Sequence, residues 1–264
     1  MSVSVKRTGG LGQLYQPLDK NQNQIRIVTV LGRPDVRDDL PCSLDIISLQ
    51  DKPNFVALSY QWHPATPPDC KPLSLRTTEG HGLKLQVNLS SYLRHHASPG
   101  LRLWIDAICI DQNNLEERSQ QVTIMDRIYR ESARLHIWLG PEQNNSGLAL
   151  EMLEKSRKSW DRIRALGVHA QQYMARTRLS HMSMQTKYDR TWAAIKALLD
   201  RPYWGRGWIL QEVLLGRDSF LIAGQHQASF SGLIVLWISC LYANVKGAPV
   251  SLSMERRSLS PHDL

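Results

Sequence analysis

Residues 201–212, RPYWGRGWILQE, carry the side chains in this chain that are best suited to chemistry. Trp204, Trp208 and Glu212 are spaced by four, so on a helix they would share one face. An aromatic platform beside a carboxylate and Arg206 suits a ligand with a flat ring, sugar hydroxyls and phosphates. The alternative, which the spacing alone favours, is that the tryptophans belong to the core and Glu212 to the surface.

Signatures of the common enzyme classes are missing from the sequence. The glycine-rich patterns that bind dinucleotides or nucleoside triphosphates, the GxSxG motif of hydrolases and the zinc-binding HExxH motif are absent. The nine histidines are scattered, and the neighbours His95 and His96 would not face one site on a helix. We therefore expect no metal site and no resident cofactor.

The segment best able to organise a fold runs from residue 101 to residue 140. Its first part, residues 101–110, is apolar except at Arg102 and Asp106, which predicts a strand covered on both faces. Asp106 would then lie in mid-strand, where a buried structural carboxylate is an alternative to a functional one. Residues 134–139 predict a second apolar strand.

Between these two strands the sequence predicts a helix. Asn114 and Glu117 have the spacing of a capping box, with Asn in place of Ser or Thr. Val122, Met125 and Tyr129 recur at helical spacing. Strand, helix and strand in this order make a right-handed βαβ unit, the building block of an α/β sheet.

Further strands and helices are expected on both sides of this unit. Residues 55–62, FVALSYQW, predict a strand, and Tyr60 and Trp62 stand at its carboxyl end, where open α/β sheets bind ligands. The other expected elements are strands at 25–31 and 219–223, a strand or helical turn at 40–49, a hairpin from 73–75 and 83–87, and helices at 88–96, 146–166, 189–199 and 230–245. The last of these helices is apolar enough to be buried.

The length of 264 residues suits one large domain. We expect residues 1–24 to form a flexible N-terminal arm, residues 25–250 to form the domain and residues 251–264 to be a disordered tail. Residues 141–200 are expected to be a largely helical insertion within the domain.

The net charge of +8 and the sequence pI near 9.5 make acidic partners worth considering. Much of the excess lies in residues 161–206, which contain nine Lys or Arg against three Asp. Such a segment could face nucleic acid, but the recognised nucleic-acid-binding patterns are absent. A solvated surface is the favoured interpretation, and we expect no nucleic-acid partner.

Cysteine usage and hydropathy indicate the compartment. The four cysteines, at positions 42, 70, 109 and 240, form no CxxC pair, so neither a disulfide framework nor a structural zinc site is expected. The first residues lack the apolar core of a signal peptide, and the longest apolar run, residues 233–243, is too short to cross a bilayer. We therefore expect no membrane span and a cytoplasmic location.

Three blocks of sequence resemble, in this order, the fungal heterokaryon incompatibility (HET) domain family. They are ALSYQWH at 57–63, LWIDAICIDQNNLEERSQQVTIMDRIYRESARLHIWLG at 103–140 and RPYWGRGWILQE at 201–212. The family is implicated in non-self recognition and regulated cell death in filamentous fungi, and its fold is related to the Toll/interleukin-receptor (TIR) domain. The resemblance implies an α/β fold with a TIR-like (flavodoxin-like), mostly parallel sheet flanked by helices.

The resemblance also implies a site. LSY at 58–60 is similar to the end of the first TIR strand, and Trp208 and Glu212 match the W-C-x-x-E pattern in spacing, although Ile209 departs from its cysteine. In enzymatic TIR domains that glutamate is the catalytic residue of NAD+ glycohydrolysis, which makes Glu212 the catalytic candidate. The side chains expected to contact NAD+ are Tyr60, Trp62, Asp106, Arg206 and Trp208.

Two functions stay open at this point. One is an NAD+-consuming cell-death effector, in which a carboxylate against the ribose stabilises an oxocarbenium-like transition state and NAD+ is the substrate rather than a cofactor. The other is a non-enzymatic signalling or self-assembly module that docks copies of itself or other HET, TIR-like or NLR-type proteins. A sequence match does not separate the two.

Overall fold

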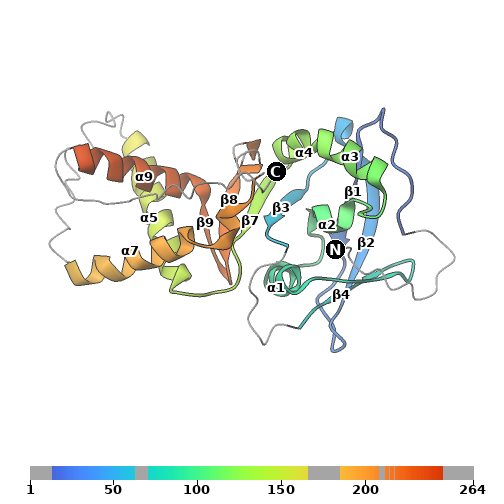
Figure 1. Ribbon diagram of the computed structural model, residues 1–264, viewed down its shortest axis with the longest axis horizontal. Coiled ribbons are helices and arrows are strands. Elements are labelled where there is room, and N and C mark those ends of the chain that lie inside the picture. The colour runs from blue at the N-terminus through green and yellow to red at the C-terminus, as the bar shows by residue number, and fades with distance from the viewer. Residues whose placement is uncertain are drawn as a thin grey trace, which may run out of the picture.

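The computed structural model of the protein describes residues 14–62, 71–165, 185–207, 212, 213, 215, 216 and 218–245. These residues form an α/β structure built on a nine-stranded sheet with the order β5-β4-β2-β1-β6-β3-β7-β8-β9 (Figure 1). The strands are β1 (Gln24–Val30), β2 (Asp39–Ser48), β3 (Val56–Tyr60), β4 (Ser74–Thr77), β5 (Gly82–Lys84), β6 (Arg102–Trp104), β7 (Arg134–Trp138), β8 (Ser219–Ala223) and β9 (His226–Ser229).

The sheet is mixed, so the expectation of a mostly parallel sheet is wrong. Neighbours β3–β6, β3–β7, β7–β8 and β2–β4 run parallel, whereas β1–β2, β1–β6, β4–β5 and β8–β9 run antiparallel. The parallel pairs β6-β3-β7-β8 form one continuous block at the centre. Antiparallel pairing arises in the pairs β1–β2, β4–β5 and β8–β9, which follow one another in the chain, and where β1 joins the block beside β6. The sequence analysis missed β9.

Helices connect and cover the strands. Their bounds are α1 (Val87–His96), α2 (Asp106–Cys109), α3 (Leu115–Thr123), α4 (Met125–Glu131), α5 (Ser146–Ala165), α7 (Gln185–Leu199) and α9 (Phe230–Val245), with 3-10 turns η1 (Leu49–Asp51) and η2 (Pro202–Gly205). Among the residues that the structure describes, each helix is too short or too polar to traverse a lipid bilayer.

The predicted strand over residues 101–110 is wrong beyond Trp104. The chain leaves the sheet there, and α2 begins at Asp106, whose carboxylate accepts a hydrogen bond from the backbone N–H of Ala107 at 2.7 Å. The turn is stabilised further because Cys109 Sγ accepts from the Ile105 N–H at 3.3 Å. Burial of this short helix gives the same unbroken apolar run as a buried strand, which is why the sequence pattern misled.

The helix predicted after residue 114 exists but is divided at Ile124 into α3 and α4. Asn114 caps α3 by accepting from the Glu117 N–H at 3.1 Å, as expected. The Glu117 carboxylate does not close the capping box, because it pairs with the buried guanidinium of Arg26 at 2.6 Å. Val122 is 46% exposed, so its predicted place in the apolar stripe is wrong.

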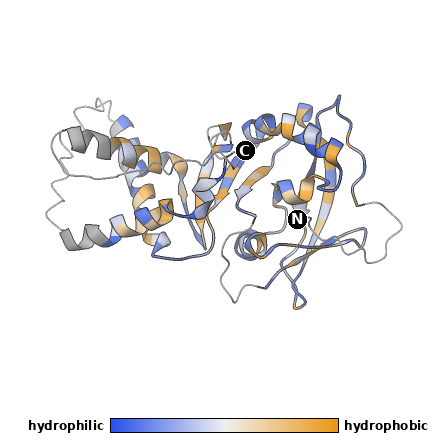
Figure 2. Cartoon of the chain, in the orientation of Figure 1, coloured by the Kyte–Doolittle hydropathy of each residue, from blue (hydrophilic) through white to orange (hydrophobic). Residues whose placement is uncertain are grey.

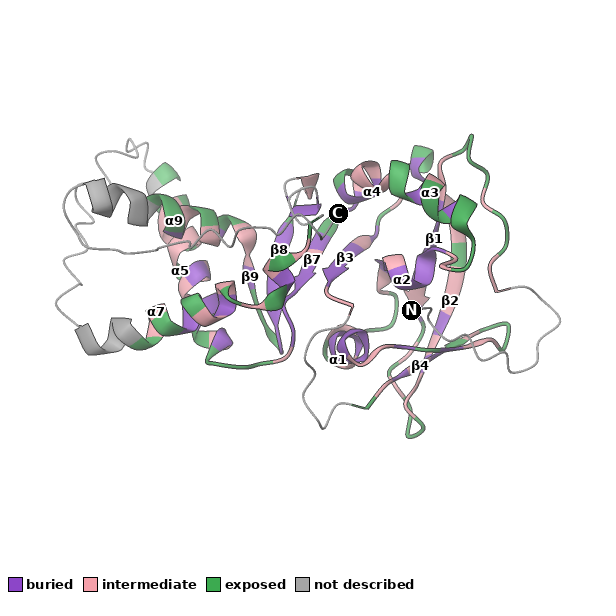
Figure 3. Cartoon of the chain, in the orientation of Figure 1, coloured by how far each residue is buried: buried purple, intermediate pink, exposed green. Residues whose placement is uncertain are grey.

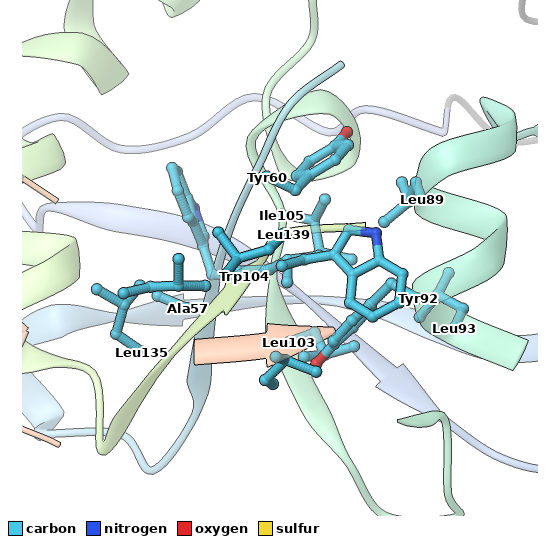
Figure 4. Close-up of a cluster of buried hydrophobic side chains, with 14 of the residues drawn as sticks. Ala57, Tyr60, Leu89, Tyr92, Leu93, Leu103, Trp104, Ile105, Leu135 and Leu139 are labelled. Atoms are coloured by element: carbon cyan, nitrogen blue, oxygen red, sulfur yellow. The ribbon is translucent and has the colours of Figure 1, made fainter. Parts of the chain in front are cut away.

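Strand β3 lies at the centre of the core, and its two faces are covered by different helices. Register places Leu58 and Tyr60 beside His136 and Trp138 of β7, on the face where the Tyr92 hydroxyl of α1 meets His136 Nδ1 at 2.7 Å. Ala57 and Ser59 face the other way, together with Trp104, against which Tyr129 of α4 packs edge to face at 5.6 Å. Figure 4 shows part of this two-sided core around the β3, β6 and β7 strands.

Helices α5, α7 and α9 gather beside the β8–β9 end of the sheet (Figure 1). Helices α5 and α7 fall in the predicted helical insertion, although the limits of that insertion, of the arm and of the domain stay predictions. The expectation that α9 is buried is wrong for one side of the helix, where Trp237 is 56% exposed. Residues 63–70 after β3, residues 166–184 between α5 and α7 and the predicted tail at 251–264 lie outside the described residues.

Candidate functional site

The carboxyl ends of β3, β6 and β7 meet at one edge of the central block. From β3 the chain passes to β6 on one side, and from β6 it crosses back to β7 on the other side of β3. In open α/β sheets, ligands bind at the point where the strand order reverses in this way. The end of β3 beside β7 is therefore the place to search for a site.

Ser59 and Glu212 meet at this edge. Both are buried, each with about 1% of its surface exposed. The Ser59 hydroxyl donates a short hydrogen bond to the Glu212 carboxylate, and the Tyr203 hydroxyl lies 2.6 Å from Ser59 Oγ. Because Ser59 has a single hydroxyl proton and gives it to the carboxylate, the Tyr203 hydroxyl is the donor to Ser59.

Arg206 completes this network, which we call the Glu212 network: Ser59, Tyr203, Arg206 and Glu212. The two terminal nitrogens of Arg206 donate to the two Glu212 carboxylate oxygens at 3.1 and 3.3 Å. One of these nitrogens also donates to Ser59 Oγ at 3.2 Å. The guanidinium lies over the Tyr203 ring, 5.5 Å from its centre. Such a forked pair is the geometry in which arginine binds a carboxylate most strongly.

Charge and burial together set the properties of the network. Burial lowers the pKa of Arg206, but the neighbouring carboxylates, first Glu212 and then Asp106, raise it, and the net result is a pKa above the usual value. Burial, with the Glu212 charge, raises the pKa of Tyr129, which shows that α4 lies close to the carboxylate. The network therefore holds a charged guanidinium against a carboxylate among neutral phenols.

The turn η2 brings Tyr203 and Arg206 to the sheet. Pro202 occupies the first turn of η2, and Arg206 ends it in an extended conformation at φ −77° and ψ 136°. Arg201 anchors this turn by donating to the carbonyls of Leu139, after β7, at 2.9 Å, and of Gln143 at 3.2 Å. The extended Arg206 ends η2, so Trp204 does not lie on one continuous helix with Glu212, whereas Trp208 falls outside the described residues.

Asp106 and Trp62 form a second polar pair at the same edge. The Trp62 indole N–H lies 3.0 and 3.2 Å from the two Asp106 carboxylate oxygens. Burial raises the pKa of Asp106 to about 6, with a further rise from the Glu212 charge and an opposing effect from Arg206 and Trp62. These mutual influences place Asp106 within electrostatic reach of the Glu212 network.

Two further predicted aromatic residues, Tyr60 and Trp204, are described. Tyr60 is buried on the α1 face of β3, opposite Ser59, because side chains alternate along a strand. Burial raises the pKa of Tyr60, and the charges of Asp106 and Arg206 also influence that pKa, so its hydroxyl lies within electrostatic reach of this edge. The Trp204 indole donates to the Leu198 carbonyl at 3.0 Å and packs on Tyr203, which is a structural role. Trp208 lies outside the described residues.

Two residues of the network were missed by the sequence analysis. Ser59 lies within the apolar run of β3 and Tyr203 within η2, and 144 positions separate them. The sequence held one signal for Ser59. Side chains alternate along the strand predicted at 55–62, so Ser59 had to lie on the face opposite Tyr60.

The network is closed in this structure. A cavity of about 310 Å³ lies elsewhere, between residues near the N-terminus, β2 and the β4 hairpin, and Glu212 does not line it. Over the part of the chain that the structure describes, no group of three or more His, Cys, Asp or Glu side chains is arranged to hold a metal ion. The chemistry that a carboxylate can supply at this edge is the stabilisation of a developing positive charge.

Comparison with known proteins places the chain in a family. No solved structure matches it. Heterokaryon incompatibility protein 6, OR allele, of Neurospora crassa is 26% identical over 234 residues, a match that covers 78% of this chain and 34% of that protein. The chain thus spans about a third of the length of this curated relative. The family model described as heterokaryon incompatibility protein (HET) matches residues 55–212, more than half of the chain, which therefore belongs to the heterokaryon incompatibility family.

Proposed function

We propose that the chain is a cytoplasmic module of heterokaryon incompatibility that contributes to regulated cell death after non-self recognition. The family match over residues 55–212 and the Neurospora crassa relative support this proposal. The matched block contains β3, η2 and Glu212, so the Glu212 network belongs to the part of the chain that defines the family.

We further propose that the module is an NAD+ glycohydrolase with Glu212 as its catalytic carboxylate. The observation that carries this proposal is the position of Glu212, which Ser59 and Arg206 hold at the carboxyl end of β3. Numbered along the chain, the parallel block β6-β3-β7-β8 has the order 2-1-3-4, as in flavodoxin-like sheets, whose ligands bind between the first and third of these strands. This order also supports a relationship to TIR domains.

The reaction follows from the charge on the substrate. The bond between the ribose C1′ and the nicotinamide nitrogen breaks, and its electron pair neutralises the departing pyridinium ring. The ribose is left as an oxocarbenium-like centre, which the Glu212 carboxylate stabilises. Water then forms the new bond to C1′ and releases a proton to solvent, giving ADP-ribose.

The buried Glu212 carboxylate must become accessible before it can contact a ribose. Arg206 is the more accessible partner, since 21% of its side chain is exposed against 2% for Glu212. A substrate phosphate competes with the carboxylate for the same guanidinium, because both are anionic acceptors of its paired N–H groups. In this proposal, Arg206 moves to the phosphate as the dinucleotide enters and frees Glu212.

The test is nicotinamide release from NAD+ by the purified chain, measured by chromatography over a range of protein concentrations. Glu212→Gln should lower the rate on the order of 100-fold or more, as loss of a transition-state charge partner does. Glu131→Gln changes a partly exposed helical carboxylate paired with Arg127 and should leave the rate unchanged. Equal release from the wild type and Glu212→Gln would remove Glu212 from the mechanism.

A second function is favoured by the burial of the same residue. Glu212 is nearly inaccessible and bonded by Arg206 and Ser59, as expected of an ion pair that fastens η2 to β3 in a non-enzymatic signalling module. If the wild type releases no nicotinamide at any concentration while Glu212→Gln lowers the melting temperature, this function replaces the enzymatic one.

A further inference from the structure

The two oxygens of the Glu212 carboxylate have different partners. Among the residues that the structure describes, Oε1 accepts one hydrogen bond, from Arg206 at 3.1 Å. Oε2 accepts from Arg206 at 3.3 Å and also from the Ser59 hydroxyl. Departure of Arg206, which the proposed function requires, would therefore release Oε1 and leave Oε2 bonded to Ser59.

The other partners of Ser59 fix the direction of its hydroxyl. Its oxygen accepts from the Tyr203 hydroxyl at 2.6 Å and from Arg206 at 3.2 Å, which together use both of its lone pairs. The single proton of Ser59 is then directed to Glu212. After Arg206 departs, Tyr203 still donates to the same oxygen, so the hydroxyl keeps a partner that orients it.

Ser59 and Arg206 lie on elements of different kinds. Ser59 is on β3 opposite Ile137 of β7, and β3 is hydrophobic over most of its length and buried (Figures 2 and 3). Arg206 follows η2 in an extended conformation, and 21% of its side chain is exposed. A group on a buried strand is positioned more precisely than one on a turn, so Ser59 is suited to hold the carboxylate while Arg206 moves.

We propose that Ser59 and Tyr203 are positioning residues for Glu212, which hold its Oε2 after Arg206 leaves so that Oε1 faces the ribose. The proposal rests on the NAD+ glycohydrolase function and adds the parts that Ser59 and Tyr203 play in it. A carboxylate held by one oxygen keeps the other in a defined place, which lowers the entropy lost in reaching the transition state. Neither positioning residue contacts the substrate, so each acts on the rate through Glu212.

Nicotinamide release at several NAD+ concentrations tests the proposal, because positioning affects kcat and substrate binding affects KM. Ser59→Ala should lower kcat about 10- to 100-fold, as loss of a hydrogen bond to a charged group does, with KM unchanged within about twofold. Tyr203→Phe keeps the Ser59 proton but removes the group that directs it, so kcat should fall only about 2- to 10-fold. Ser59→Thr keeps a hydroxyl and should restore most of the rate lost in Ser59→Ala.

Ser90→Ala is the matched control for Ser59→Ala. Ser90 is also a fully buried serine with two hydrogen-bond partners, the Leu73 N–H at 2.8 Å and the Gln86 carbonyl at 2.9 Å, but it lies on α1. Its replacement should lower the melting temperature, as Ser59→Ala does, and leave kcat unchanged. A Ser59→Ala protein with the wild-type kcat, or with a loss that Ser90→Ala matches, would overturn the proposal while NAD+ hydrolysis stands.

A crystal structure of Arg206→Met tests the positioning without catalysis. This variant lacks the guanidinium, so the Glu212 carboxylate is held by Ser59 or turns away. Oε2 should stay within hydrogen-bonding distance of Ser59 Oγ, and a carboxylate turned away from Ser59 would refute the positioning role. Arg206→Lys, which cannot form the forked pair, replaces Arg206→Met if that protein does not fold. A wild type that releases no nicotinamide while the Ser59 bond persists would instead remove the enzymatic function on which the proposal rests.

Discussion

At the scale of single residues, the Glu212 network shows how a carboxylate can be given partners for both of its oxygens inside the protein. A buried ion is tolerated only when partners replace its water, and Glu212 has a guanidinium and a hydroxyl in that role. The Tyr203 hydroxyl in turn satisfies Ser59. Removal of one member therefore leaves another without a partner, which has a larger effect than the loss of one average hydrogen bond.

This dependence predicts strong coupling between Arg206 and Glu212. Glu212→Gln or Arg206→Met alone should lower the free energy of unfolding by about 3–5 kcal/mol, as breaking a buried pair does. The double variant should lose less than the sum of the two, leaving a coupling of about 1–3 kcal/mol. Urea unfolding of the four proteins measures this cycle.

The exposed pair Arg134–Asp218 supplies the control cycle. Its side chains are 59% and 50% exposed at a separation of 3.3 Å, so its coupling should stay below about 1 kcal/mol. Equal coupling in both cycles would mean that the Glu212 pair is worth no more than a surface pair.

Asp106 predicts a dependence of stability on pH. Its pKa is about 6 in the folded state against 3.8 as a free side chain, so the folded state binds more protons between these values. The wild type should therefore lose stability relative to Asp106→Asn as the pH rises from 4 to 7, by about 3 kcal/mol at most. The amide of this variant would keep an oxygen to accept from Trp62. Unfolding measured at several pH values tests this, and a constant difference between the two proteins would contradict it.

The sequence predicted the charged members of the site but not the members that connect them. Glu212 and Arg206 were found because the family resemblance draws attention to residues 201–212. Ser59 and Tyr203 were missed because neither residue type stands out in its own segment, and their contact spans 144 positions. Tyr60 was grouped with Glu212 from its nearness to the strand end. Alternation places its side chain on the face of β3 opposite Ser59, but the charges of Asp106 and Arg206 still influence its pKa, so its role in the site stays a prediction.

At the scale of elements, the close contact between α5 and α9 depends on one small residue. Gly232 lies in the first turn of α9 against the Leu153 backbone, where no side chain fits. Backbone, unlike the end of a side chain, cannot move aside without shifting the whole helix. The packing of α9 against α5 is therefore set at this position.

Gly232→Ala should therefore destabilise the protein by about 1–3 kcal/mol, as overpacking does. Gly205→Ala is the matched control, since no atom lies within 4 Å of the Cβ position there, and it should change stability little. Thermal unfolding of both variants makes the comparison. A Gly232→Ala protein as stable as the wild type would show that α5 and α9 can separate freely.

Elements with a clear period were predicted well, whereas those set by tertiary contacts were not. Strands β1, β3, β7 and β8 and helices α1 and α7 lie close to their expected positions. The short helix α2 was missed because a buried helical turn and a buried strand give the same apolar run. The break at Ile124 and the turn η2 were missed because local propensity does not specify where a helix must bend to reach a neighbour.

At the scale of the whole molecule, the α/β class follows from the alternation of strands and helices along the chain. The mixed sheet does not, because the orientation of β1, β2 and β9 depends on which edge each strand joins. A βαβ unit in the sequence fixes parallel strands only within the unit. In this molecule β6 and β7, the two strands of that unit, are not neighbours in the sheet. Strand β3, which comes earlier in the chain, lies between them.

The distance along the chain between β3 and η2 has a consequence for synthesis. Tyr203 and Glu212 reach Ser59 across 144 and 153 positions, so the contact closes only after most of the polypeptide has left the ribosome. Contacts of such high sequence separation form late in folding, because the entropy of closing the intervening loop must be overcome first. A nascent chain that stops before residue 203 has no network, and any activity that depends on Glu212 cannot begin while translation of the domain is unfinished.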